Sequence, residues 1–288
     1  MNLHPLAGTK APASMLLNVE KLVAAYYDMQ IDPGDPACMV KFGTSGHRGS
    51  SFAGSFNEAH VLAITQAICD FRSAQGIDGP LFIGMDTHAL SNPAHGSAVE
   101  VLAANGVNVR LHRNGGYTPT PVISHAVLTH NRKNPSAVSD GIVITPSHNP
   151  PEDGGIKYNP PHGGPAGAEV TAWIAERANT LMKDGNRDVA RISFDRALKS
   201  ETTREYDYVT SYVEDLEAVV DMEIIRSSGL RMAAAAMGGS GLGFWVPIAD
   251  YFDLNIKVFH DTPDAAFSST ALDHDAKMRM DCSSAYAM

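Results

Sequence analysis

The chain has 288 residues, of which 44% are hydrophobic, so it can bury one large core or two ordinary ones. It carries 32 acidic against 22 basic residues, a formal charge of −10, and no block of Lys or Arg, which argues against nucleic acid or an anionic membrane as a partner. Its three cysteines, Cys38, Cys69 and Cys282, lie far apart without paired metal-ligand spacing. They predict reduced thiols rather than a disulfide framework or a zinc site.

The N-terminal residues show no basic region followed by an apolar core, and no run approaches the roughly 18 apolar residues of a membrane span. We therefore expect a cytoplasmic protein with no membrane partner. The sequence leaves the oligomeric state open.

The first predicted elements are helices. Ser14 can cap one over residues 15–29, and Asn57 can cap a second one that Gly76 would end. A strand at 81–84 follows. A third helix opens at Asn92 and ends near residue 105, before a strand at 107–111.

The next unit repeats this order, with a helix over 120–130, a strand over 141–145 and, after a long loop, a helix over 169–183. A second unit then shows a helix over 205–220, a strand over 230–235, a helix ending at 252 with Pro247 inside it, and a strand over 255–259. This alternation predicts an α/β fold with mixed sheets covered by helices. We expect an N-terminal helical extension over 1–40, a first domain over 41–190 and a second domain over 191–288.

Ser147 stands on the most distinctive loop of the sequence. The segment from Ser147 to Gly164 contains four prolines and four glycines, so fixed backbone positions alternate with freely turning ones. Open α/β folds place ligand sites at the carboxyl ends of strands, where this loop begins. His148 follows directly, but in extended backbone it would point away from Ser147, and no GxSxG elbow surrounds the serine, which argues against a hydrolase. From these residues alone, Ser147 is either a reactive group or a solvated turn residue.

A second dense loop runs from Lys41 to Gly49 and contains three glycines. Four of its side chains can donate to an anion: Thr44, Ser45, His47 and Arg48. Arginine binds phosphate through its planar fork, and glycines let backbone N–H groups approach oxygen atoms. The alternative is a surface turn, and the spacing does not match a P-loop.

Two further segments leave alternatives open. Lys157 lies ten residues after Ser147, and a folded loop would bring its ammonium back towards the serine oxygen; otherwise it is an ordinary solvated lysine. The glycine-rich turn from Gly238 to Gly241 offers either a phosphate site at a helix N-terminus or simply a tight connection.

Four motifs in this order resemble those of the α-D-phosphohexomutases, the bacterial phosphoglucomutases in particular. They are Lys41 to Gly49, Asp86 to His88, Tyr117 to Pro121 and Thr145 to Lys157. The resemblance extends from about residue 14 to the C-terminus. It implies a serine that passes a phosphoryl group to glucose 1-phosphate or glucose 6-phosphate, and that takes the other phosphate back from glucose 1,6-bisphosphate.

The resemblance also implies roles for individual residues. Ser147 would be the phosphoryl carrier and, through its phosphate oxygen, a ligand of Mg²⁺. Lys157 would assist proton transfer and charge balance, with His148 beside the phosphoserine. The substrate-binding residues would be Arg48, Thr44, Ser45 and His47. Phosphoryl transfer requires positioning and charge neutralisation, which a rigid loop, an arginine, a lysine and Mg²⁺ supply.

The family has four domains, of which this sequence offers the first and much of the second. The family's Asp-rich DxDxDR metal loop, sugar-recognition segment and C-terminal phosphate-binding domain have no counterpart here. Ser283 or Ser284 could cap a helix, but too few residues follow them to form one. We therefore expect a second domain truncated at its C-terminus. The alternatives are a non-catalytic remnant that binds sugar phosphate or a partner chain, and a mutase for mannose or glucosamine phosphate.

Overall fold

The computed structural model describes residues 3–43, 46–259 and 262–287. The helices in this part of the chain are α1 (Val19–Asp28), α2 (Glu58–Gln75), α3 (Ser91–Ala104), α4 (Thr120–Lys133), α5 (Ala168–Lys183), α6 (Phe194–Leu198), α7 (Tyr208–Glu214), α8 (Met222–Ser227) and α9 (Leu242–Phe252). The strands are β1 (Gly46–Ser50), β2 (Leu81–Met85), β3 (Val109–His112), β4 (Asp140–Ile144), β5 (Asp153–Asn159), β6 (Thr203–Tyr206), β7 (Met232–Ala235) and β8 (Ile256–Phe259). Over the described residues, no helix combines the length and the apolar character needed to cross a membrane.

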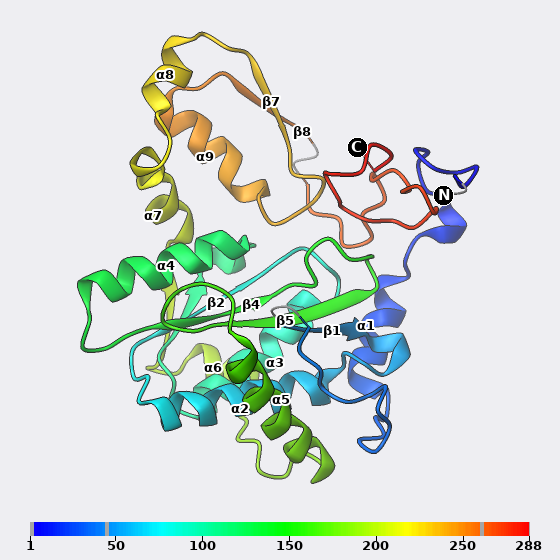
Figure 1. Cartoon of the computed structure of the whole chain (residues 1–288), viewed down its shortest axis with the longest axis vertical. Helices are drawn as coiled ribbons and strands as arrows, with labels where there is room; N and C mark the ends of the chain where they lie inside the picture. Colours follow the sequence, from blue (N-terminus) through cyan, green and yellow to red (C-terminus); the bar gives the residue numbers. More distant parts are fainter. Residues whose placement is uncertain (1–2, 44–45, 260–261, 288) are drawn as a thin grey trace.

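Six strands form one mixed sheet in the order β1-β5-β4-β2-β3-β6 (Figure 1). Strands β4, β2, β3 and β6 run parallel, whereas β5 is antiparallel to both β4 and β1. Strands β7 and β8 pair in parallel as a separate small sheet. The predicted α/β fold with a mixed sheet covered by helices is confirmed.

Helices cover both faces of the large sheet (Figure 1). Side chains alternate between the faces along each strand. In β2, Leu81 and Ile83 therefore join the core under α2, α3 and α5. Phe82 points the other way, into a smaller core under α4 that includes Ile123 and Val143.

The first helix is shorter than its predicted span of 15–29. Ser14 lies in a single 3-10 turn, and Leu16 is extended with φ −71° and ψ 140°. Asn18 is the actual cap, because its side chain accepts a hydrogen bond from the Lys21 amide at 2.9 Å. The predicted end of the second helix is confirmed, since Gly76 adopts a left-handed φ of 64° there.

The predicted helix over 205–220 is wrong. Its start is strand β6, which pairs in parallel with β3 at the edge of the large sheet. Asp207 then caps the short helix α7 by accepting from the Thr210 amide at 2.9 Å. Strand β6 extends the large sheet past residue 190, and the domain boundary placed there stays a prediction.

Strands β1 and β5 were not predicted, because the sequence indicated loops over both. In register, Gly46 faces Lys157, Arg48 faces Gly155 and Gly49 faces Gly154. A Cβ on Gly154 would meet the Phe56 ring, and one on Gly155 would meet the Thr145 carbonyl oxygen. The two glycines thus allow close packing inside a strand.

The N-terminal segment lies beside the C-terminal segment (Figure 1). The Gly8 amide donates to the Leu272 carbonyl at 2.8 Å, and the Leu272 amide donates to the Thr9 carbonyl at 2.9 Å. Phe267 is buried in the small core that joins the two segments. This arrangement brings residues after β8 over the edge of the large sheet where Ser147 lies.

Candidate functional site

Ser147 lies at the carboxyl end of β4, on the loop that connects β4 to β5. The neighbouring strand β2 ends at the same edge, because β2 and β4 are parallel and Met85 pairs with Ile144. A cavity of about 280 Å³ opens there. Its lining comes from the loop, the residues after β2, the start of α4, the turn between β7 and α9, and the C-terminal segment: Asp86, Thr87, His88, Thr120, Thr145, Ser147, His148, Ala236, Gly239, Ser240, Phe267 and Met280.

Two cationic side chains converge on the Ser147 hydroxyl. Lys157 donates from Nζ to Oγ at 2.8 Å, and Arg48 donates from a guanidinium nitrogen to Oγ at 3.2 Å. Arg48 and Lys157 are diagonal neighbours in the β1–β5 ladder and share one face of the sheet. The sheet register, rather than the loop itself, brings both charges to the serine.

The backbone at Ser147 is not extended as the sequence analysis assumed. Its φ of 70° is left-handed, a region that non-glycine residues rarely adopt. His148 is exposed, and its Nδ1 lies 3.9 Å from an Asp281 carboxylate oxygen. The imidazole thus extends towards the C-terminal segment, while Lys157 and Arg48 occupy the hydrogen-bonding positions at the Ser147 oxygen.

Electrostatics at the site favour a less basic lysine. Burial lowers the pKa of Lys157, the nearby Arg48 charge lowers it further, and Asp86 partly opposes both effects. An amine with a lowered pKa exchanges protons more readily near neutral pH. The Lys157–Ser147 pair is therefore suited to move a proton to or from the serine oxygen.

His47 lies away from Ser147. Its ring is buried, with one nitrogen 2.8 Å from the Ser55 carbonyl oxygen and the other 3.2 Å from the Lys41 carbonyl oxygen. It stacks on the His60 ring at a centroid distance of 5.3 Å. His47 thus fastens the segment before β1 instead of facing the cavity.

The other two predicted substrate-binding residues, Thr44 and Ser45, lie outside the described residues. Of the predicted set, the structure therefore brings Ser147, Lys157 and Arg48 together. It places His148 at the rim of the same cavity.

Two helix N-termini also face this cavity. Thr120 is the first residue of α4, and Gly239 and Ser240 come just before α9. Helix N-termini attract anions because their first N–H groups are unpaired and the helix dipole is positive there. The glycine-rich turn is thus placed where it can contact an anionic ligand.

Asp86 and Thr120 both line the cavity, although neither was a predicted site residue. The signal for Asp86 was present, since polar residues directly follow a buried strand at the edge where Ser147 lies. Thr120 could be found only from the prediction that a helix starts there.

The residues around Ser147 do not form a magnesium site by themselves. Mg²⁺ needs oxygen ligands, usually carboxylates. Asp86 supplies the only carboxylate among the described residues that line the cavity, and its oxygens accept hydrogen bonds from His88, Ser91 and Thr145. A separate cluster of Asp273, His274 and Asp275 has ligand atoms within 4.8 Å of one another, and Arg279 already pairs with both of its carboxylates.

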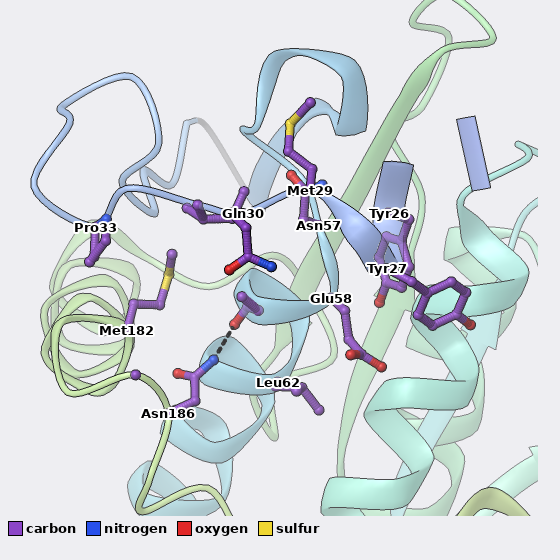
Figure 2. A pocket seen from close by; sticks show the side chains of 13 residues that line it. Tyr26, Tyr27, Met29, Gln30, Pro33, Asn57, Glu58, Leu62, Met182 and Asn186 are labelled. Carbon is purple, nitrogen blue, oxygen red and sulfur yellow. Dashed lines mark hydrogen bonds between the residues drawn. The ribbon is translucent and has the colours of Figure 1, made fainter. Parts of the chain in front are cut away.

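A second pocket, of about 310 Å³, lies between the end of α1, the start of α2 and the end of α5 (Figure 2). Tyr27, Gln30 and Met182 line it. Asn186 closes one side, where its amide donates to the Ala59 carbonyl at 2.9 Å. None of the predicted site residues lines this pocket.

The fold and the site define an α/β protein that presents one serine to two cations at a sheet edge. Residues 39–184 match the family description "Phosphoglucomutase/phosphomannomutase, alpha/beta/alpha domain I". The chain therefore belongs to the phosphoglucomutase/phosphomannomutase family.

Relatives and solved structures agree with this assignment. The chain is 53% identical over 287 residues to a phosphoglucomutase of Komagataeibacter xylinus, which covers all of this chain and 52% of the relative. It is 33% identical over 193 residues to phosphoglucomutase 1 of Drosophila melanogaster, covering 60% of this chain and 33% of the relative. A putative phosphomannomutase of Thermus thermophilus superposes with a TM-score of 0.67 at 25% identity, covering 82% of this chain and 49% of that one. The chain thus spans about half the length of the Komagataeibacter relative.

Proposed function

We propose that this chain is the phosphoryl-carrying part of a phosphoglucomutase, which interconverts glucose 1-phosphate and glucose 6-phosphate through glucose 1,6-bisphosphate. The observation that carries the proposal is the convergence of Lys157 and Arg48 on the Ser147 oxygen. Two cations at one hydroxyl suit a group that alternates between a neutral alcohol and a dianionic phosphate.

The same contacts account for the proton on the serine oxygen. When phosphoserine is the donor, the Oγ–P bond breaks, a P–O bond to a sugar hydroxyl forms, and the sugar hydroxyl passes its proton to water. The Lys157 ammonium lies at hydrogen-bond distance and protonates the departing Ser147 oxygen. In the reverse step, the neutral amine takes the proton back, while Arg48 stays cationic throughout.

The remaining expectations belong to this proposal. His148, Thr44 and Ser45 would contact the substrate or the phosphoserine, and His47 would act through the loop that it fastens. The domain division at residues 40 and 190 and a cytoplasmic location are also proposed. Because no free carboxylate surrounds Ser147 among the described residues, we assign no step to Mg²⁺.

Glucose is favoured over mannose and glucosamine as the substrate sugar. The support is the 53% identity to a phosphoglucomutase, against 25% identity to the putative phosphomannomutase. A non-catalytic remnant that binds sugar phosphate is the second candidate. It is favoured by the cavity at Ser147, where, among the described residues, the one carboxylate is that of Asp86 and already accepts hydrogen bonds from His88, Ser91 and Thr145.

A coupled assay for glucose 6-phosphate, run on the 288-residue chain with glucose 1-phosphate, glucose 1,6-bisphosphate and Mg²⁺, tests these readings. Turnover that disappears in Ser147→Ala supports the proposal. Faster conversion of mannose 1-phosphate, measured in a parallel assay for mannose 6-phosphate, would assign the activity to that sugar instead. Calorimetry with glucose 1,6-bisphosphate identifies a remnant, which would bind without turnover.

A further inference from the structure

The segment from Asp86 to His88 directly follows β2 and is buried beneath the Ser147 loop. The proposed chemistry uses none of its side chains. It nevertheless contacts the loop on both sides of the serine, through two hydrogen-bonded routes that share Asp86 Oδ2.

The first route starts from the Asp86 carboxylate. Oδ2 accepts from the Thr145 hydroxyl at 2.5 Å, and the Thr145 hydroxyl oxygen in turn accepts from the Ser147 amide at 2.8 Å. Oδ1 is fixed by Ser91 and by the His88 amide, at 2.5 and 3.0 Å. The carboxylate therefore has a single orientation, and the Ser147 amide is held through one intervening hydroxyl.

The second route runs through the His88 ring. Nδ1 donates to Asp86 Oδ2 at 2.9 Å, and Nε2 donates to the Asn149 carbonyl at 3.0 Å. The ring packs against Phe267, with 4.9 Å between centroids. Both ring nitrogens face acceptors, which is the pattern of an imidazolium. Burial alone would lower the pKa of His88, but Asp86 and the Asn149 carbonyl raise it above its usual value.

The first route holds the loop at Thr145, two residues before Ser147, and the second holds it at Asn149, two residues after. The residue between them has a left-handed φ of 70°. Such a conformation persists only where its surroundings hold it. Without the two attachments, the backbone would relax towards an ordinary conformation, and Oγ would turn away from Lys157 and Arg48.

We propose that Asp86 and His88 form a positioning pair that holds Ser147 in its left-handed conformation, so that its oxygen faces Lys157 and Arg48. The pair acts on Ser147 through Thr145 and Asn149. Its effect on phosphoryl transfer rests on the proposed function of Ser147. Its effect on the loop backbone does not, and the two can be measured separately.

The test compares His88→Leu, which removes both donors, with His88→Gln, whose amide can again supply two N–H groups. His125→Gln is the matched control, since His125 also pairs with an aspartate, Asp215 at 2.7 Å, on the α4 surface. Amide hydrogen exchange of residues 145–149 reports on the loop. Intact mass after incubation with glucose 1,6-bisphosphate reports on phosphorylation of Ser147.

We expect His88→Leu to speed exchange of the Ser147 amide by at least about tenfold, with the rest of the sheet unchanged. Phosphorylation of Ser147 should slow by a similar factor without a change in bisphosphate affinity, and His88→Gln should recover part of both. Unchanged loop exchange in His88→Leu would overturn the proposal.

If His88→Leu does not fold, a second variant, Thr145→Val, tests the same proposal. Thr145→Val is nearly isosteric and removes only the hydroxyl between Asp86 and the Ser147 amide. It should speed exchange of that amide while the Asn149 carbonyl stays bonded to His88, and protection equal to wild type would contradict the first route. A wild-type chain that takes no phosphate refutes the function of Ser147, and the exchange data still decide on the positioning pair.

Discussion

Lys157 Nζ lies 2.8 Å from Ser147 Oγ, although ten residues separate them along the chain. The antiparallel pairing of β4 with β5 produces this contact, with Val143 opposite Lys157. The sheet places Lys157, and the conformation of the loop places the Ser147 oxygen opposite it. The contact underlies the first prediction.

Lys157→Met should slow phosphorylation of Ser147 from glucose 1,6-bisphosphate by about 10²-fold, because proton transfer to and from Oγ loses its partner. Since the pKa of Lys157 is lowered by burial and by Arg48, the neutral amine forms at lower pH than in an ordinary lysine. The wild-type rate of serine phosphorylation should therefore rise with pH below the range of free lysine. Lys157→Arg, which stays protonated, should lose this rise.

Lys133→Met is the matched control, since Lys133 is exposed at the end of α4. It should leave both the rate and its pH dependence unchanged. An unaltered pH profile in Lys157→Met would argue against a proton-transfer role.

Ser147→Gly and Ser147→Ala should differ in stability even though both lose the hydroxyl. The left-handed φ of 70° is open to glycine but strained for alanine. Urea unfolding should show the glycine variant more stable than the alanine variant by about 1 kcal/mol. Equal or reversed midpoints would mean that the loop relaxes freely, contrary to the account of a held serine.

Gly155→Ala should destabilise the protein by about 2 kcal/mol, because its Cβ would meet the Thr145 carbonyl oxygen and Pro146 between β4 and β5. Gly243→Ala is the control: it adds a methyl in α9 where no atom lies within 4 Å. That change should stabilise the chain by about 0.5 kcal/mol through helix propensity. Thermal unfolding of both variants measures the difference, and a neutral Gly155→Ala would show that the hairpin adapts.

His47 should make the fold sensitive to acid. Burial and the neighbouring His60 lower the pKa of His47 from 6.5 to about 4. Between these pH values His47 is protonated in the unfolded chain but neutral in the folded chain. The contribution of neutral His47 is complete above pH 6.5 and declines as the pH falls to about 4, by about 3 kcal/mol in all. Denaturant unfolding across this window should show a shallower pH dependence in His47→Gln. Parallel curves for wild type and variant would contradict the assignment.

The parts of the fold that were predictable are those whose signals are local. Asn57 and Gly76 mark the ends of α2, and the apolar run before Ser147 marks β4. The turn at Ser147 was also identified from the prolines that follow it, although the loop predicted beyond it contains strand β5. Each of these signals lies within a few residues of the feature it specifies.

The parts that were missed depend on distant partners. Strand β1 contains two glycines, a histidine and an arginine, and it is a strand only because β5 pairs with it. His47 was grouped with Arg48 because both are polar, but alternation along β1 buries His47 and exposes Arg48. The bracketing of Ser147 by Asp86 and His88 likewise needs β2 and β4 side by side, which no local pattern reveals.

The most direct test of the account is site-resolved mass spectrometry of the 288-residue chain after incubation with glucose 1,6-bisphosphate and Mg²⁺. The account predicts one added phosphoryl group, located on Ser147, absent from Ser147→Ala and removed again by excess glucose 1-phosphate or glucose 6-phosphate. A phosphoryl group on another residue, or none on a folded chain that binds the bisphosphate, would contradict it.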